Sequence, residues 1–267
     1  MSEPAALPRF YELSVPKDWT AIDFISDLHL SEDTPRTFAA WADHLRHTSA
    51  SAVFILGDLF EVWVGDDARH AGFEAQCAEV LADAASRRPI GFMAGNRDFL
   101  VGGELLKACG LIALPDPTVL IAFSERVMLS HGDALCLADR PYQAFRSQVR
   151  SAAWQREFLG RPLPARREEA RRLRALSEAQ KQSMRPEDWV DIDISTAVRW
   201  MHEASTPTLV HGHTHRPASE SMAPGYRREV LSDWDLDHAT PPRAEVLRLR
   251  RAGLSRIPPT TQAEPLA

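Results

Sequence analysis

Five short apolar runs along the chain each stop abruptly at a polar motif. The runs are rich in Val, Ile, Leu and Phe, and such runs of 4–6 residues are typical of strands that are buried on both faces. In chain order the runs are AIDFIS, SAVFIL, PIGFMA, RVMLS and PTLV. The motifs that follow them are Asp27-Leu-His29, Gly57-Asp58, Gly95-Asn96-Arg97-Asp98, His131-Gly132-Asp133 and His211-Gly-His213-Thr-His215.

Helical patterns lie between several of these runs. The apolar positions in 37–47 and in 73–87 recur with the period of an amphipathic helix. They are Phe38, Trp41, Ala42 and Leu45 in the first segment, and Cys77, Val80, Leu81 and Ala84 in the second. Alternation of strand, motif and helix predicts a layered α/β domain, in which catalytic loops gather at the carboxyl ends of the strands. We therefore expect the five motifs to converge in space.

The pattern changes between the fourth and fifth motifs, where no strand-like run occurs and Arg is frequent. Apolar residues at helical spacing indicate a helical insertion, and YRREVLSDW and RAEVLRLRR further on are typical of closing strands. The predicted organisation is an N-terminal extension (1–19), a core formed by 20–140 and 204–251, a helical cap (141–203), and a disordered tail (252–267).

Composition restricts the class of protein. The chain is 44% hydrophobic and 25% charged, as soluble globular proteins are, and its net charge of −6 argues against nucleic acid as a partner. The three cysteines form no CxxC pair, which indicates buried thiols in a reducing compartment. The N-terminal segment lacks the features of a secretory signal, and no apolar run reaches the ~18 residues that span a bilayer. We expect a cytoplasmic protein whose membrane contact, if any, is peripheral.

The five motifs offer seven side chains that suit divalent metals of intermediate softness, which prefer imidazole and carboxylate ligands together. They are Asp27, His29, Asp58, Asn96, His131, His213 and His215. Seven ligands suit two ions, and Asp58 is the best bridge because it follows a central strand. Two such ions activate a water and clamp phosphoryl oxygens, so no protein nucleophile is needed. His211 lies inside an apolar run and is expected to be a core residue or to support a ligand.

The order of these motifs resembles the calcineurin-like metallophosphoesterases. Longer strings, including Gly57-Asp-Leu-Phe-Glu61, Gly95-Asn-Arg-Asp-Phe99 and Gly212-His-Thr-His-Arg-Pro217, resemble one branch, the UDP-2,3-diacylglucosamine hydrolases (diphosphatases) of lipid A biosynthesis. The resemblance implies a layered β-sandwich flanked by helices with an inserted helical cap. It also implies two Mn²⁺ ions, although other divalent transition metals are possible. One ion would be held by Asp27, His29, Asp58 and His215, and the other by Asp58, Asn96, His131 and His213.

The same resemblance implies an activity and its partners. Hydrolysis of the pyrophosphate of UDP-2,3-diacylglucosamine would yield 2,3-diacylglucosamine 1-phosphate (lipid X) and UMP, through attack of a metal-bound hydroxide on the α phosphorus. The enzyme would act as a monomer on an anionic membrane surface, at the cytoplasmic face of the inner membrane. The implied substrate contacts are Asn96, Arg97, Asp139, Ser177, Lys181 and His213. The chain departs from the pattern of the branch at Met184, where a basic residue is expected.

Arg97 distinguishes this chain from most phosphodiesterases of the superfamily, in which a His follows the Gly-Asn pair and protonates the leaving group. A guanidinium is a poor proton donor but a good clamp on phosphate oxygens. An enzyme without the acid needs a leaving group that departs unprotonated, and a phosphate monoester is such a group. Arg97 is therefore predicted to be catalytic and to favour cleavage of a diphosphate.

Other interpretations remain open at this stage. The chain could be an esterase acting on cyclic nucleotides, dinucleoside polyphosphates or DNA, although Arg97 and the basic cap argue against it. A non-catalytic scaffold that has kept the fold is a second alternative, although none of the seven ligands is missing. The Arg-rich segment could be a solvated helix face instead of a substrate-binding cap.

Overall fold

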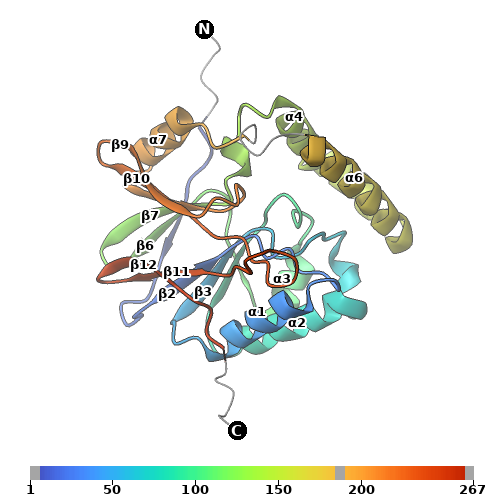
Figure 1. Ribbon diagram of the computed structural model, residues 1–267, viewed down its shortest axis with the longest axis horizontal. Coiled ribbons are helices and arrows are strands. Elements are labelled where there is room, and N and C mark those ends of the chain that lie inside the picture. Colours follow the sequence, from blue (N-terminus) through green and yellow to red (C-terminus); the bar gives the residue numbers. More distant parts are fainter. Residues whose placement is uncertain (1–6, 184–189, 262–267) are drawn as a thin grey trace.

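The computed structural model describes residues 7–183 and 190–261, with the backbone alone described for 176–183. Its centre is a pair of six-stranded sheets that pack face to face (Figure 1). We call them the β2 sheet, with strand order β12-β11-β2-β3-β4-β5, and the β7 sheet, with strand order β1-β6-β7-β8-β10-β9. The strands are β1 (Tyr11–Ser14), β2 (Ile22–Ile25), β3 (Ala52–Leu56), β4 (Ile90–Met93), β5 (Ile112–Ala113), β6 (Thr118–Ala122), β7 (Glu125–Ser130), β8 (Thr208–His211), β9 (Ala218–Ala223), β10 (Tyr226–Val230), β11 (Val246–Arg250) and β12 (Gly253–Ile257).

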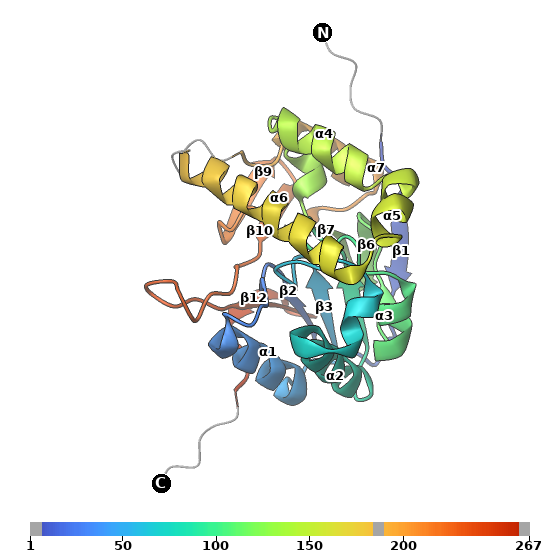
Figure 2. The same ribbon diagram turned by 90° about the vertical axis from the view of Figure 1, so that its right-hand side faces the viewer.

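Helices cover the outer faces of the two sheets (Figure 1). They are α1 (Pro35–His47), α2 (Gly72–Ala85), α3 (Gly103–Cys109), α4 (Arg140–Val149), α5 (Ala152–Leu159), α6 (Leu163–Ser183) and α7 (Ile194–Glu203), with short 3-10 turns η1 (Asp66–His70) and η2 (Asp133–Leu135). Helices α1–α3 lie on the β2 sheet and α7 lies on the β7 sheet, while α6 runs obliquely across one side of both (Figure 2).

Strand β3 shows how the apolar runs build the core. All five of its residues are buried. Val53 and Ile55 face the helices, while Phe54 and Leu56 face the opposite sheet. This alternation places apolar side chains on both faces of the strand, which is why the run is continuously hydrophobic.

The sequence prediction of a layered α/β fold is confirmed. All five apolar runs form strands, the segments 37–47 and 73–87 form α1 and α2, and both predicted closing segments contain strands, β10 and β11. Strands β2, β3, β4 and β5 are parallel, and so are β7, β8 and β10. The carboxyl ends of β2, β3, β4, β7 and β8 therefore carry the five motifs.

The boundary of the predicted cap at residue 203 is wrong. Helix α7 belongs to the core, because Ala197, Trp200 and Met201 pack with Val119 and Leu209 of the β7 sheet. One face of α7 carries apolar residues at helical spacing, and this face is buried. The pattern is hard to recognise in the sequence because an Arg-rich segment comes directly before it. Helices α4, α5 and α6 make up the rest of the inserted segment.

Both predicted terminal segments contribute a strand. The residues from 252 onward are not wholly disordered, because Gly253–Ile257 forms β12 and pairs antiparallel with β11. Leu254 and Ile257 pack on the hydrophobic core, and this burial stabilises the hairpin. At the other end, Tyr11–Ser14 of the N-terminal extension forms β1 and pairs with β6.

A buried ion pair links the β2 sheet to its closing strand. Asp23 is fully buried and accepts hydrogen bonds from Arg248 at 2.6 and 2.7 Å and from Thr48 at 2.6 Å. Burial alone would raise the pKa of Asp23, but the contacts with Arg248, His44 and Thr48 outweigh it and lower the pKa to about 2. The ionised carboxylate is therefore the form that the fold stabilises.

Replacing Asp23 with Asn should destabilise the chain by about 3 kcal/mol or more, because it leaves the buried Arg248 without its counter-charge. Urea unfolding measures the loss. The control is Asp83→Asn, which removes a surface pair with Arg87 and should cost less than ~1 kcal/mol. Because the folded pKa lies below the unfolded value of 3.8, the difference between wild type and Asp23→Asn should persist above pH 4 and shrink towards pH 2. A difference independent of pH across this range would contradict the assignment.

Candidate metal centre

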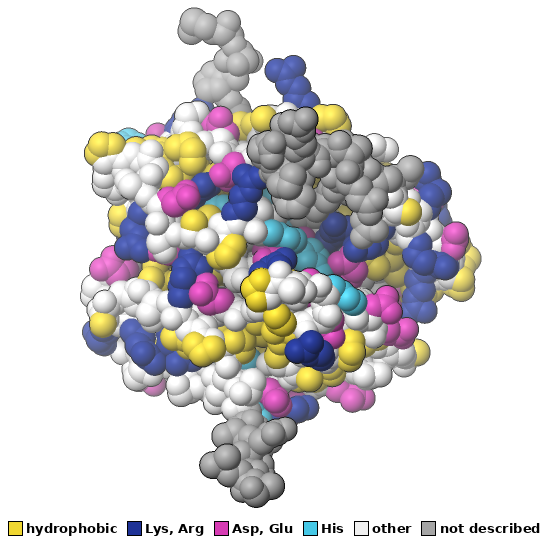
Figure 3. Space-filling view, viewed as in Figure 1, with side chains coloured by type: hydrophobic (Ala, Val, Ile, Leu, Met, Phe, Trp, Pro, Cys, Tyr) yellow, Lys and Arg dark blue, Asp and Glu magenta, His cyan; other side chains and the backbone are white. Residues whose placement is uncertain are grey.

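Sharp turns at the ends of the strands aim the candidate ligands at one region. Asp27, His29, Asp58, His213 and His215 all have positive φ angles, between 48° and 68°. Non-glycine residues rarely adopt this left-handed backbone, which costs of order 1 kcal/mol each and persists where the surrounding structure enforces it. Such turns directly after a strand direct the side chain back over the edge of the sheet. Histidine side chains reach the surface near the middle of the face in Figure 3.

The first group of ligands contains Asp27, His29 and His215, whose ligand atoms all lie within 4.8 Å of one another. His29 Nε2 lies 3.2 Å from His215 Nε2, and His215 Nε2 lies 3.3 Å from Asp27 Oδ1. The β2 sheet supplies Asp27 and His29, whereas His215 follows β8 of the other sheet. This part of the site is therefore assembled where the two sheets meet.

The second group surrounds the side chain of Asn96. Its Oδ1 lies 2.9 Å from His131 Nε2 and 2.8 Å from His213 Nδ1. His131 Nε2 lies 3.7 Å from Asp58 Oδ2. Ligand atoms of Asp27, Asp58 and His131 also fit within 4.8 Å of one another. All seven predicted ligands are thus adjacent, and the carboxylates of Asp27 and Asp58 lie where the two groups meet.

The outer nitrogen atoms of the imidazoles are held by the protein, as is usual for metal-binding histidines. His131 Nδ1 donates to the Leu56 carbonyl at 2.9 Å, so its Nε2 is the ring nitrogen that is directed at Asn96 and Asp58. His29 Nδ1 lies 3.2 Å from Glu61 Oε2, and His215 Nδ1 lies 3.6 Å from Asp233 Oδ2. The donor set of imidazoles, carboxylates and one amide oxygen fits divalent transition metals.

The pKa values of the histidines at the site are shifted in opposite directions. Burial lowers the pKa of His29 to about 3 and that of His213 to about 4, which keeps both rings neutral and able to bind a cation. Burial also acts against the charged form of His131, but the carboxylates of Asp58 and Asp27 outweigh it and raise the pKa to about 9. The site is therefore rich in negative charge, which attracts cations.

Asp98 holds two of the ligand loops together and was missed as a functional residue by the sequence analysis. Its carboxylate accepts backbone hydrogen bonds from Gly95 at 2.7 Å, Leu59 at 2.8 Å and Asp58 at 3.3 Å. Gly95 is required here because a Cβ atom would lie 2.2 Å from Asp58 Oδ1. Its place in the Gly-Asn-Arg-Asp string is the signal that could have identified Asp98. Glu61 and Asp233, which lie beside His29 and His215, were also missed.

Arg97 and Asp139 were predicted to contact substrate. The Arg97 backbone donates to Asp58 Oδ1 at 2.8 Å, and its Nη1 lies 3.9 Å from Glu61 Oε1, so its guanidinium borders the first ligand group. Asp139 caps α4 by accepting from the Tyr142 backbone at 3.0 Å. The side chains of Ser177 and Lys181, and the whole of Met184, lie outside the described residues.

The remaining His and Cys predictions concern buried groups. His211 is fully buried, and its Nδ1 donates to the Gly212 carbonyl at 2.9 Å, as expected for a core residue. Cys77, Cys109 and Cys136 are free and buried, which confirms buried thiols. Burial raises the pKa of Cys109 to about 11, so this thiol is not activated.

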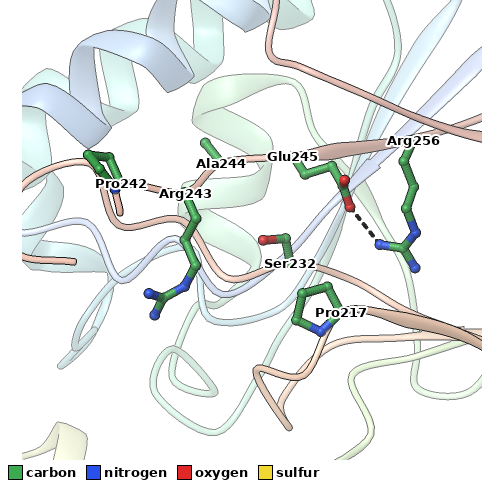
Figure 4. A pocket seen from close by; sticks show the side chains of 7 residues that line it. All are labelled: Pro217, Ser232, Pro242, Arg243, Ala244, Glu245 and Arg256. Carbon is green, nitrogen blue, oxygen red and sulfur yellow. Dashed lines mark hydrogen bonds and ion pairs between the residues drawn. The ribbon is translucent and has the colours of Figure 1, made fainter. Parts of the chain in front are cut away.

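A pocket of about 380 Å³ is lined by seven residues, Ser232 and Arg243 among them (Figure 4). Arg243 relates it to the first ligand group, because its Nε donates to Asp233 Oδ1 at 2.8 Å and Asp233 in turn lies beside His215. Arg256, on the other side, pairs with Glu245 at 2.6 Å. Both guanidiniums are therefore already engaged by carboxylates.

Among the described residues, no helix is both long and apolar enough to cross a membrane.

Comparison with known proteins identifies the family. No protein-family model matches the chain. It is 42% identical to UDP-2,3-diacylglucosamine hydrolase of Chromobacterium violaceum, over 80% of this chain and 90% of that protein. Proteins of the same name from Bordetella pertussis and Xanthomonas campestris pv. campestris are 41% and 40% identical, over 86% and 79% of this chain and 91% and 90% of theirs. Among solved structures, a novel archaeal phosphodiesterase aligns with a TM-score of 0.45 at 12% identity, over 89% of this chain and 98% of that one. At these levels of sequence identity and coverage, the chain belongs to the UDP-2,3-diacylglucosamine hydrolase family.

Proposed function

We propose that this chain hydrolyses the pyrophosphate bond of UDP-2,3-diacylglucosamine to 2,3-diacylglucosamine 1-phosphate and UMP, as a step of lipid A biosynthesis. The observation that carries the proposal is the convergence of seven candidate metal ligands with Arg97 at their border. The names of the relatives support the choice of substrate.

Two Mn²⁺ ions are the proposed cofactors. Asp27, His29, Asp58 and His215 would hold one, and Asp58, Asn96, His131 and His213 would hold the other. When bound, such a pair of cations supplies an activated water and neutralises charge on the phosphoryl oxygens. Asp58 is the proposed bridge, and the hydrogen bond from the Arg97 backbone fixes its carboxylate.

Arg97 is the residue proposed to select the diphosphate. Its guanidinium is held near the site by Glu61, and it can donate two parallel hydrogen bonds to phosphate oxygens. It remains protonated at neutral pH and so supplies no proton to a leaving group. A sugar phosphate leaves without that proton, whereas an alkoxide does not leave readily. Asn96 and His213, at the second ligand group, are further proposed contacts of the substrate.

Water labelled with ¹⁸O tests which phosphorus is attacked. Attack at the α phosphorus, on the uridine side, places the label in UMP and leaves the sugar phosphate unlabelled. Mass spectrometry of the two products after a single turnover measures the distribution. Label found in 2,3-diacylglucosamine 1-phosphate would rule out this direction of attack.

The inserted helices are proposed to cover the lipid part of the substrate. Arg166 is buried and binds Asp67 and the Val64 carbonyl, and Arg167 pairs with Glu74 at 3.0 Å, so α6 is fixed beside the loop that follows β3. On this frame Asp139, Ser177 and Lys181 are the proposed cap contacts, while the exposed basic residues of α6 would face anionic lipid. We further propose a monomer that works peripherally on the cytoplasmic face of the inner membrane.

A further inference from the structure

Helix α4 and Arg150, the residue that caps its C-terminus, send three side chains to one buried carboxylate. Tyr142 Oη donates to Asp133 Oδ2 at 2.6 Å, Arg146 Nε donates to the same atom at 2.7 Å, and Arg150 Nη2 lies 3.5 Å from it. Asp133 is fully buried and stands two residues after His131. The helix is thus attached to the loop that carries one of the ligands in the second group.

Arg150 also reaches a second ligand loop. The Nη2 atom that approaches Asp133 donates to the Gly95 carbonyl at 2.8 Å, and the guanidinium lies over the Phe99 ring at 5.7 Å from its centroid. Gly95 immediately precedes Asn96. Arg150 therefore bridges the loop that follows β4 of the β2 sheet and the loop that follows β7 of the other sheet.

The bridge spans the joint at which the second ligand group is assembled. Asn96 Oδ1 and His131 Nε2 are 2.9 Å apart, although the two residues come from different sheets. Metal affinity depends steeply on such spacing, and loss of an outer contact typically lowers it 10–100-fold.

We propose that Arg150 is a positioning residue that fixes the distance between Asn96 and His131 and thereby sets the affinity of the second metal site. The inference rests on the proposed two-metal function. Arg150 acts through the two loops and needs no contact with the substrate. The positive charge of Arg150 faces the buried carboxylate of Asp133, so the contact of Arg150 with the loop that follows β7 is charge-assisted.

The test replaces Arg150 with Met, which keeps much of the apolar stem and removes both hydrogen bonds. Binding of Mn²⁺ to the metal-depleted protein is followed by electron paramagnetic resonance, in which free, singly bound and spin-coupled Mn²⁺ are distinguished. Relative to wild type, one Mn²⁺ should bind about 10–100-fold more weakly while the other stays within about threefold. The spin-coupled signal should appear only at higher Mn²⁺ concentrations.

Four further variants make the result specific. Arg156→Met removes an exposed arginine of α5 and should leave both affinities unchanged. Arg146→Met loses an Asp133 contact but keeps the bridge to Gly95, so its effect should be smaller than that of Arg150→Met. In a His131→Ala background, Arg150→Met should cause no further loss at the remaining site. Arg150→Lys, which can reach one acceptor but not both, should be intermediate and serves if the Met variant does not fold.

The outcomes separate this inference from the proposed function. Wild type that binds fewer than two Mn²⁺ overturns both. Wild type that binds two, with Arg150→Met unchanged or weakened equally at both sites, overturns the positioning role alone. The positioning role is supported if Arg150→Met weakens one site selectively and causes no further weakening when it is combined with His131→Ala.

Discussion

Replacing Asp58 with alanine is expected to lower UMP release from UDP-2,3-diacylglucosamine by about 10³-fold or more. Asp58 is the proposed bridge between two cations, and each supplies several kcal/mol of charge stabilisation to the transition state. Its carboxylate also accepts the Arg97 backbone hydrogen bond, so the loop that carries Arg97 loses an anchor. The measurement is initial rate by chromatography of UMP, beside elemental analysis of bound manganese.

The matched control is Asp83→Ala, which removes a partly exposed acid of α2 that pairs with Arg87 and should leave the rate unchanged. Circular dichroism of Asp58→Ala should remain close to wild type, because the residue serves the site more than the core. If Asp58→Ala kept more than about a tenth of the wild-type rate at saturating Mn²⁺, the bridging assignment would be wrong.

Substituting Arg97 with His should lower kcat on the UDP-lipid by about 10²–10³-fold, the usual cost of losing one oriented donor to a transition-state oxygen. The same substitution supplies a proton donor, so cleavage of an aryl phosphodiester by the variant should rise relative to the UDP-lipid. Arg97→Lys retains the charge but not the paired hydrogen bonds, and it should lie between wild type and Arg97→His. Steady-state rates of all three proteins on both substrates measure the change in preference.

This comparison has a clear contrary outcome. An Arg97→His enzyme that retained its full diphosphatase rate would show that the clamp is dispensable. The control is Arg161→His, which removes an exposed arginine that pairs with Glu157 on α5 and should leave both activities unchanged. Metal content should stay the same in every variant, because no arginine is a proposed ligand.

Much of the fold was predictable because the central strands are buried on both faces. A run such as Ala52–Leu56 leaves no polar position that would suit a helix surface, so its pattern has one interpretation. The ligands were predictable for a related reason, since each follows such a run and parallel strands end at a common edge. The seven residues therefore emerged from local patterns, although their meeting depends on both sheets.

What the sequence did not reveal depends on contacts between distant segments. Helix α7 packs against Val119 and Met128, and β11, the partner of β12, pairs in turn with β2, so the placement of both elements depends on segments that lie far away in the chain. Asp98 resembles an ordinary turn residue until its four backbone donors are brought together by the fold. Arg150 is one of many arginines in its segment, and only its contacts with Gly95 and Asp133 distinguish it.

Release of UMP from UDP-2,3-diacylglucosamine by metal-depleted protein, before and after reconstitution with Mn²⁺, tests the central proposal most directly. We expect no release without metal, and with Mn²⁺ equal amounts of UMP and 2,3-diacylglucosamine 1-phosphate, with the rate rising as the second ion binds. The proposal would be contradicted by a reconstituted protein that leaves the UDP-lipid intact while cleaving a cyclic or aryl phosphodiester, or by one that binds no manganese.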